Sequence, residues 1–584
     1  MISAGLVPLI GVLLTAVISL SGQSALTDQD IARFLLTPAG LIGVLGVVCV
    51  AITAAVLEVA VMIGLLGRGE RGPVKALRYG VSLLASRLPQ LLAFSLGLLL
   101  RVLAIVVPFL LLIGVIAWIG LRRHDINYYL TYWPPEFLAV ATMGGALALI
   151  MAWVLLRKAA GWALALPIFL TQRCPVAMAF AKAADSLPQH RRALQRDLVA
   201  WVVIRLTCTA VIAGLTGAGI ALVADLAGTN LRLIAAGTLA LLLIWGLANA
   251  CVAAWSNGAL ASLLVTDAER ATATRILIAP TEGTGRLPYL AVLGVAAVCI
   301  AAGLVFANGL LDRVTTQHDV TIIAHRGAAG LRPENTMAAV RKAIEDGADW
   351  IEIDVQETAD GEIVVAHDSD FMKLAGVELK VWDATVADIA AIDIGSWFDP
   401  AYASERTPLL RDVLVEARGR AKVMIELKYY GHDVALEAKV AQLVEAAGMV
   451  DAVAVMSLKY PGVQKFHALR PGWRTGLLAA KAVGDLSGLD SDFLALNTGQ
   501  ITMRLIDEAH AKGKEVYAWT VDDPATMSRM ISMGVDGLIT NQPALARQVV
   551  AQRAELATGE RLMLWIADWF NLGTYRLASD ERDA

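Results

Sequence analysis

The stretch from Ile322 to Asp368 decides the fold of this chain, because it combines strand-like apolar runs with four polar motifs. The motifs read His325-Arg326-Gly327, Arg332-Pro333-Glu334-Asn335-Thr336, Trp350-Ile351-Glu352-Ile353-Asp354 and Ala366-His367-Asp368. Residues i and i+2 of a strand share a face, so Glu352 and Asp354 are expected to point the same way. Two histidines, two aligned carboxylates and an arginine near strand ends predict metal-assisted chemistry on a phosphate.

The chain from residue 321 to about 550 predicts a parallel α/β barrel, because short apolar runs alternate there with helical patterns. One such helix is expected over 336–346, with Met337, Val340 and Ile344 on one stripe. A run over 362–366 follows the second strand too closely for a parallel crossover, which predicts a hairpin arm carrying His367 over the barrel mouth. The eight predicted strands are 321–324, 350–355, 421–427, 452–457, 474–479, 492–496, 515–520 and 536–540.

These motifs resemble those of the glycerophosphodiester phosphodiesterases, a family of phospholipase-C-like TIM barrels. The resemblance covers about residues 320–550 and implies hydrolysis of glycerophosphodiesters to sn-glycerol 3-phosphate and an alcohol. It also implies that an insertion over 369–407 helps to enclose the glycerol group. Three later motifs carry the likeness further: Glu426-Leu427-Lys428, Ala518-Trp519-Thr520 and Asp536-Gly537-Leu538-Ile539-Thr540.

Three carboxylates on two predicted strands, Glu352, Asp354 and Glu426, are expected to hold a divalent cation. Hard oxygen ligands suit Ca²⁺ or Mg²⁺. Arg326 is predicted to clamp phosphate oxygens in a bidentate manner. Lys428 shares a face with Glu426 by the i, i+2 rule, so a cation among carboxylates predicts a phosphate between them.

His325 and His367 are predicted to be the acid/base pair, since imidazole gives and takes protons near neutral pH. The family resemblance implies that both are catalytic, and the sequence leaves open which is the acid. Trp519 ends a predicted strand at the mouth and is expected to bind the glycerol group, with core packing as the alternative. Glu334 is interpreted as structural. No role is assigned to Asp522, where the family often has Asn.

Residues 1–311 predict a membrane region, because they concentrate the apolar excess of a chain with mean hydropathy +0.61 and 57% hydrophobic residues. A bilayer core needs about 20 apolar residues of helix. The region resembles, by its apolar pattern, the membrane domain fused to some bacterial members of the family. The seven predicted spans are 3–22, 41–66, 88–121, 137–156, 199–225, 233–265 and 288–311.

The loops between these spans predict the orientation. Loops 67–87, 157–198 and 266–287 contain 15 Lys and Arg residues, and the alternate loops contain four. Because Lys and Arg remain on the cytoplasmic side, a chain with seven spans places its N-terminus inside and residue 312 outside. The expected protein is a multi-pass inner-membrane protein with an extracytoplasmic, periplasmic catalytic domain.

The predicted architecture is thus an all-α transmembrane bundle over 1–315, an α/β TIM barrel over 316–550, and an amphipathic helix with a tail over 551–584. The C-terminal helix is expected either on a membrane surface or packed on the protein. The five cysteines all lie in the apolar half, so the barrel can form no disulfide. A net charge of −4 gives no indication of nucleic-acid binding.

Two other functions fit the same pattern. A phospholipase C or D acting on intact lipid would suit an enzyme tethered to the bilayer. A lipid or osmolyte transporter or sensor would use the barrel for binding only, and the complete histidine and carboxylate set argues against it. The expected partners are a glycerophosphodiester substrate and the lipid bilayer.

Overall fold

The computed structural model describes residues 13, 16–18, 25–68, 73–172, 174–186, 191–227, 231–272 and 319–555. The chain divides into two compact units, of which the first comprises residues 1–14, 41–119 and 139–305. The second comprises residues 15–40, 120–138 and 306–584. Two short segments from the N-terminal half therefore belong to the same unit as the C-terminal barrel.

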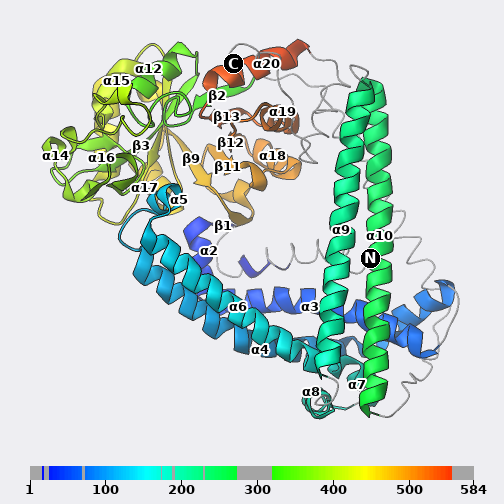
Figure 1. The fold of residues 1–584 in the computed structure, drawn as a ribbon. Helices are drawn as coiled ribbons and strands as arrows, with labels where there is room; N and C mark the ends of the chain where they lie inside the picture. The colour runs from blue at the N-terminus through cyan, green and yellow to red at the C-terminus, as the bar shows by residue number, and fades with distance from the viewer. Residues whose placement is uncertain are drawn as a thin grey trace. The chain divides into compact units, whose positions relative to one another are not determined.

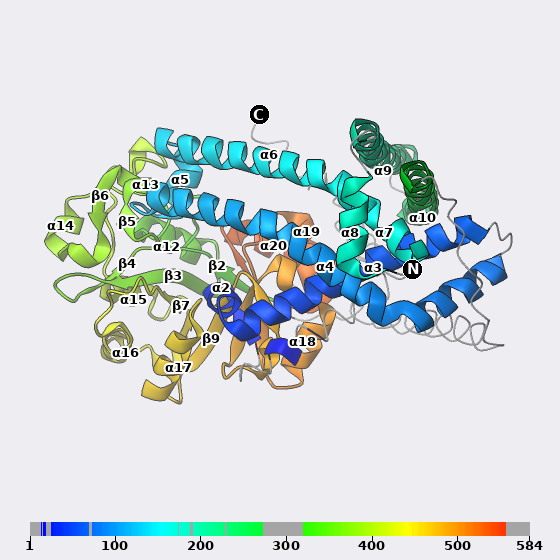
Figure 2. The same ribbon diagram turned by 90° about the horizontal axis from the view of Figure 1, so that it is seen from below.

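The first unit is built of long apolar helices, of which α9 and α10 run side by side (Figures 1 and 2). Phe94, stacked on Phe180 with ring centroids 5.0 Å apart, lies in its buried core. The helices are α3 (Pro38–Arg68), α4 (Pro73–Leu121), α6 (Pro135–Ala163), α7 (Ala165–Gln172), α8 (Val176–Asp185), α9 (Arg191–Ala227) and α10 (Leu231–Thr272).

Five helical stretches among the described residues are long and apolar enough to cross a membrane. They agree with five of the seven predicted spans. The predicted span 288–311 lies outside the described residues, as does 3–22 except for residues 13 and 16–18. The five stretches are Pro38–Leu66, Ser86–Leu121, Pro135–Gln172, Arg191–Gly219 and Ile244–Arg270.

The second unit contains a closed barrel of eight parallel strands, which confirms the predicted TIM barrel. Going round the barrel, the order is β2, β3, β7, β8, β9, β11, β12 and β13, and β13 pairs with β2 to close the ring. Each strand lies within two residues of its predicted position. The strands are β2 (Thr321–Ala324), β3 (Trp350–Glu357), β7 (Lys422–Leu427), β8 (Val453–Ser457), β9 (Arg474–Ala479), β11 (Phe493–Asn497), β12 (Glu515–Trp519) and β13 (Gly537–Thr540).

Helices surround the strands (Figure 1). The outward side chains of the strands are buried in two hydrophobic clusters with residues of these helices. The predicted helix over 336–346 is α12, whose N-cap Thr336 accepts a hydrogen bond from Ala339 N. A separate inner cluster, including Trp350, Phe493 and Tyr517, fills the barrel interior. The helices are α12 (Met337–Glu345), α15 (Leu410–Ala417), α16 (Leu436–Ala447), α17 (Tyr460–Leu469), α18 (Met503–His510), α19 (Pro524–Met533) and α20 (Pro543–Glu555).

The run after the second strand is a hairpin arm, as predicted. Strand β4 (Ile363–Val365) pairs antiparallel with the end of β3 and leads directly to His367. The following insertion contains a second small sheet and a core of its own, around Phe371, Val381 and Ile389. Its elements are β5 (Asp370–Phe371), α13 (Met372–Ala375), β6 (Val377–Lys380), η1 (Val381–Asp383), α14 (Val386–Ala390) and η2 (Pro400–Tyr402).

Two N-terminal segments complete the second unit. Strand β1 (Ala25–Thr27) pairs antiparallel with β10 (Ala482–Gly484), and α2 (Asp28–Leu35) follows it. The other segment is residues 120–138 with the short helix α5 (Ile126–Tyr132). The predicted domain boundary at 315 and the predicted C-terminal helix both fall outside the described residues, apart from the end of α20.

Candidate active site

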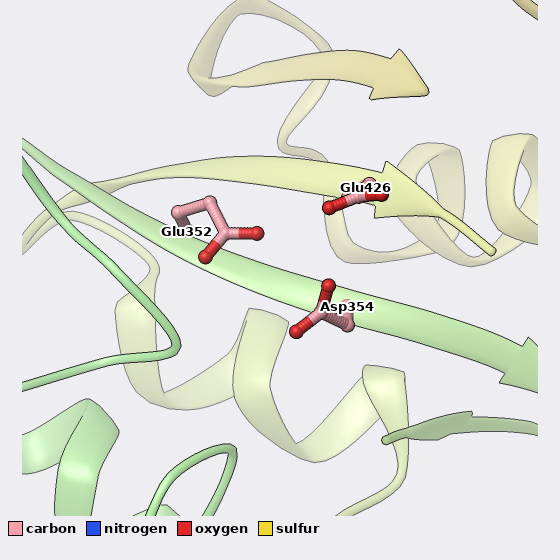
Figure 3. A group of neighbouring side chains, drawn as sticks. All are labelled: Glu352, Asp354 and Glu426. Atoms are coloured by element: carbon pink, nitrogen blue, oxygen red, sulfur yellow. The ribbon is translucent and has the colours of Figure 1, made fainter. Parts of the chain in front are cut away.

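Three carboxylates from two neighbouring strands lie together in the barrel (Figure 3). Glu352 and Asp354 belong to β3, and Glu426 belongs to β7, where it lies beside Asp354 in the register. One oxygen from each carboxylate lies within 4.8 Å of the other two, and none of the residues is more than 4% exposed. The fold thus brings together the three residues that the sequence predicts as metal ligands.

A divalent cation fits this cluster, because buried carboxylates so close together need compensating positive charge to stay ionised. Burial, reinforced by the charges of Asp354 and Glu426, raises the pKa of Glu352 well above its usual value. Burial also raises the pKa of Glu426. Three oxygen donors of this kind match the ligand preference of Ca²⁺ and Mg²⁺.

Lys428 extends into the same cluster from the residue after β7. Its Nζ lies 3.0 Å from Asp354 Oδ1 and 2.8 Å from Glu426 Oε1. Burial alone would lower the pKa of Lys428, but these two carboxylates raise it above its usual value. Burial alone would raise the pKa of Asp354, and Lys428, His367 and Arg326 instead hold it well below its usual value. A permanent positive charge therefore lies beside the predicted ligands.

The loop after β2 has an unusual backbone that directs polar groups at this cluster. Arg326 has φ +49° and Asn335 has φ +56°, conformations that cost about 1–3 kcal/mol each and cluster at functional sites. Asn335 Nδ2 donates to Asp354 Oδ2 at 2.8 Å. Gly327 has φ +79°, and a Cβ there would lie 2.7 Å from Ala339, so the motif requires glycine at this position.

Arg326 is held from both its backbone and its side chain. Its N–H donates to Glu352 Oε2 at 2.8 Å, and its guanidinium contacts Glu334 Oε1 at 2.8 Å and Asp354 Oδ2 at 3.5 Å. Lys373 Nζ pairs with the other oxygen of Glu334, Oε2, at 2.8 Å. Glu334 therefore has the structural role that the sequence suggests, and that role is to hold two cations next to the carboxylate cluster.

His325 follows β2 directly, and a polar chain fixes its ring. Its Nδ1 lies 2.8 Å from Asn541 Oδ1. Asp522 accepts hydrogen bonds from the Asn541 backbone N at 2.7 Å and from Asn541 Nδ2 at 2.6 Å. Because a carboxylate only accepts, the Asn541 amide must present its oxygen to the ring, so His325 Nδ1 carries a hydrogen and Nε2 has the free lone pair. Burial, and next the charge of Arg326, lowers the pKa of His325 to about 3.

His367 lies at the end of the hairpin arm, beside Asp368. Its Nδ1 lies 2.6 Å from Asp368 Oδ1. Burial alone would raise the pKa of Asp368, but the hydrogen bond and charge of His367 hold it below the usual value. The carboxylate therefore holds the His367 ring through Nδ1. Asn127 Nδ2 also donates to Asp368 Oδ1, at 2.8 Å, and Tyr430 OH donates to His367 O at 2.8 Å.

Trp519, the last residue of β12, has its indole N–H bonded to Ala495 O at 2.9 Å and packs against the inner barrel cluster. Its ring thus takes part in the barrel core, the alternative that the sequence left open. Its predicted contact with glycerol stays a prediction.

Several polar residues at the site escape prediction from the sequence. Asn335, Asp522 and Asn541 follow strands β2, β12 and β13, and in a barrel the loops after the strands build the site. That rule is the signal that identifies them. Lys373 and Asn127 have no comparable signal, because they reach the site from an insertion and from the segment 120–138.

Comparison with known proteins agrees with this geometry. Residues 325–545 match the model of the glycerophosphoryl diester phosphodiesterase family, and residues 1–280 match that of the membrane domain of glycerophosphoryl diester phosphodiesterase. The chain is 34% identical over 229 residues to YhdW of Bacillus subtilis, covering 38% of this chain and 94% of the relative. It is 32% identical over 229 residues to a glycerophosphodiester phosphodiesterase of Caldanaerobacter subterraneus, with the same coverage.

The chain is also similar to a solved structure, that of an Oleispira antarctica phosphodiesterase in complex with the product sn-glycerol-3-phosphate. The match has 24% sequence identity and a TM-score of 0.38, and it covers 40% of this chain and 96% of the Oleispira chain. The sequence matches define the class of protein as a phosphodiesterase with an added membrane domain. The chain belongs to the glycerophosphoryl diester phosphodiesterase family, and it is an enzyme of that family.

Proposed function

We propose that this protein hydrolyses glycerophosphodiesters to sn-glycerol 3-phosphate and an alcohol, in a metal-dependent reaction at a membrane-anchored barrel. The observation that carries the proposal is the convergence of Glu352, Asp354 and Glu426 with two separately oriented histidines. A site that only binds glycerophosphodiesters has no need for two imidazoles whose ring tautomers are each fixed by a different polar chain.

The three carboxylates would hold a Ca²⁺ or Mg²⁺ ion, with Lys428 and Arg326 beside it to bind the phosphate oxygens. The ion would supply Lewis-acid stabilisation of negative charge that develops on the phosphate. Arg326 is already oriented by Glu334 and Asp354, so little side-chain ordering remains when substrate binds. Trp519 is proposed to contact the glycerol group from the end of β12.

We assign His325 as the general base and His367 as the general acid. His325 is neutral near pH 7, and its Nε2 lone pair is free to take a proton. His367 Nδ1 lies 2.6 Å from the carboxylate of Asp368, which fixes the direction of the ring that is proposed to protonate the leaving alkoxide. Two imidazoles with environments that differ in this way are suited to opposite halves of one acid–base cycle.

The orientation of the barrel is proposed to be extracytoplasmic. Asp28 accepts hydrogen bonds from Ala480 N at 3.1 Å and Lys481 N at 2.9 Å, and the segment 120–138 bonds to residues beside His367. These two segments are separated by two candidate spans, so they lie on the same side of the bilayer. The basic loop 67–87 connects the opposite ends of those two spans and is proposed to be cytoplasmic.

The reaction is tested by identifying the products that the detergent-purified full-length protein releases from soluble glycerophosphocholine and from micellar phosphatidylcholine. The proposal expects sn-glycerol 3-phosphate and choline from the soluble diester. Exclusive turnover of the micellar lipid would instead support a phospholipase, and binding without any turnover would support a non-catalytic barrel.

A further inference from the structure

The segment 120–138 connects the candidate spans Ser86–Leu121 and Pro135–Gln172, yet it belongs to the barrel's compact unit. Asp125 caps its helix α5, accepting a hydrogen bond from Asn127 N at 3.1 Å. The same oxygen, Oδ1, accepts from Asn127 Nδ2 at 2.9 Å. The Asn127 amide is therefore fixed in orientation by its own helix cap, with its second amide hydrogen left to donate elsewhere.

That second hydrogen bond goes to the carboxylate that orients His367. Asp368 Oδ1 accepts from Asn127 Nδ2 at 2.8 Å and from His367 Nδ1 at 2.6 Å, and Asp368 is only 5% exposed. One carboxylate oxygen is thus shared between a catalytic imidazole and a residue from outside the barrel sequence. Asp125 Oδ2 adds longer contacts, at 3.4 Å, with Ser369 N and Tyr430 OH.

The same segment also contacts helix α13, which carries a residue that supports Arg326 indirectly. Tyr132 OH donates to Lys373 O at 2.6 Å. Lys373 in turn pairs with Glu334, which holds Arg326. His124, whose side chain is 9% exposed, lies 3.9 Å from Asp370 Oδ2. Four residues of one short segment therefore reach the arm and insertion on which His367 and Lys373 lie.

Two relatives of barrel length are too short to include an equivalent of segment 120–138 in addition to the barrel. An alignment of 229 residues accounts for 94% of YhdW and of the Caldanaerobacter enzyme, so both consist of little more than a barrel. The contacts of segment 120–138 are therefore an addition to the barrel site rather than part of the machinery these relatives share.

We propose that Asn127 is a positioning residue for catalysis, which holds Asp368 in the rotamer that orients His367, and that segment 120–138 thereby completes the active site. This inference rests on the proposed role of His367 in proton transfer. Without the amide, the carboxylate gains freedom to rotate away from Nδ1, and the ring loses its fixed direction. Full activity is in this way conditional on the docking of a segment between two membrane spans.

The first test compares Asn127→Asp, Asn127→Ala and Thr131→Ala in the full-length protein with glycerophosphocholine. Thr131 is an exposed residue of the same helix, and its hydroxyl donates to the Asn127 backbone carbonyl at 2.7 Å. Partners that orient metal-bound histidines are worth about 10–100-fold in activity, and we expect a similar size of effect for the group that orients His367. Both Asn127 variants should lose about that much in kcat with KM nearly unchanged, and Thr131→Ala should keep wild-type values. Equal kcat in all three variants would overturn the proposal.

The leaving group gives a readout that a loss of folding would not mimic. A glycerophosphodiester with a p-nitrophenyl leaving group needs little protonation, so the defect of Asn127→Ala should largely disappear with it. An equal loss with both substrates would mean that Asn127 supports the fold and not the acid.

A double-mutant cycle separates this inference from the proposed function. In a His367→Ala background, adding Asn127→Ala should cause no further loss of kcat, because the ring that it positions is gone. A further tenfold loss there would overturn the positioning role. If His367→Ala alone keeps wild-type kcat, the proposed function fails first; if it loses activity while Asn127→Ala does not, only this inference fails.

Discussion

Glu334 offers a sharp test of the electrostatic account, because one buried carboxylate holds two cations. Arg326 and Lys373 each contact it at 2.8 Å, and Glu334 is 8% exposed. At an effective dielectric constant of about 20, each contact is a gross attraction of about 6 kcal/mol, and burying the ions offsets most of it. Glu334→Gln leaves two cations without their counter-charge, so we expect a loss of about 3–5 kcal/mol in the free energy of unfolding of the barrel.

The loss in the free energy of unfolding caused by Glu334→Gln should depend on pH in a defined direction. Burial alone would raise the pKa of Glu334, but Arg326 and Lys373 hold it below its ordinary value of 4.5. A carboxyl with a lowered folded-state pKa contributes stability that is fully present above its unfolded pKa and is lost as the pH falls through the folded one. The difference between wild type and Glu334→Gln should therefore be constant from pH 6 to 7 and shrink below about pH 4.5.

Pulse proteolysis in urea measures the free energy of unfolding of the barrel within the full-length protein. The readout is the band of the protease-resistant barrel. The variant should lower the urea midpoint by about 1 M or more. Glu362→Gln is the matched control, because Glu362 forms an exposed pair with Arg411 at 3.0 Å, and such pairs are worth about 0–1 kcal/mol. Equal midpoints for the two variants, or a Glu334 effect that is unchanged at pH 4, would refute the reasoning.

Three other predictions follow from the site and the topology. His325→Ala and His367→Ala should each lower kcat by about 10²–10⁴-fold with little change in KM. A substrate with a p-nitrophenyl leaving group should rescue only His367→Ala, and rescue of His325→Ala instead would reverse the assignment of acid and base. Lys428→Met should raise KM for the phosphodiester substrate, because a buried cation 3.0 Å from Asp354 and 2.8 Å from Glu426 is removed, and an unchanged KM would exclude Lys428 from phosphate binding. Val434→Cys adds a thiol to the cysteine-free barrel at a position that is 88% exposed. A membrane-impermeant maleimide should label this thiol in intact spheroplasts, and labelling only after lysis would place the barrel in the cytoplasm.

The barrel could be predicted almost completely from the sequence, because each strand is a short apolar run that alternates with an amphipathic helix. The arm that ends at His367 was also predictable, since its distance from the previous strand excludes a parallel crossover. These features depend on local pattern, and local pattern is what a single sequence records best.

The supports of the site could not be predicted in the same way. Asn541, Asp522 and Asn127 act through hydrogen bonds between segments that lie far apart in the chain, and Asn127 is 241 residues from Asp368. Nothing in the composition of the segments around Asn127 and Asp368 indicates that they come into contact. Glu334 is an intermediate case, because the sequence analysis interpreted it as structural and only the fold shows that it pairs with Arg326 and Lys373.

The most direct test of the central claim is the turnover of glycerophosphocholine by the purified full-length protein after exhaustive chelation and after return of Ca²⁺ or Mg²⁺. We predict that chelation abolishes the release of sn-glycerol 3-phosphate, and that one of the two ions restores it in the wild type but not in the near-isosteric variant Glu352→Gln. Wild-type turnover in the chelated protein, or full metal-dependent activity in Glu352→Gln, would contradict the assignment of Glu352, Asp354 and Glu426 as a catalytic metal site.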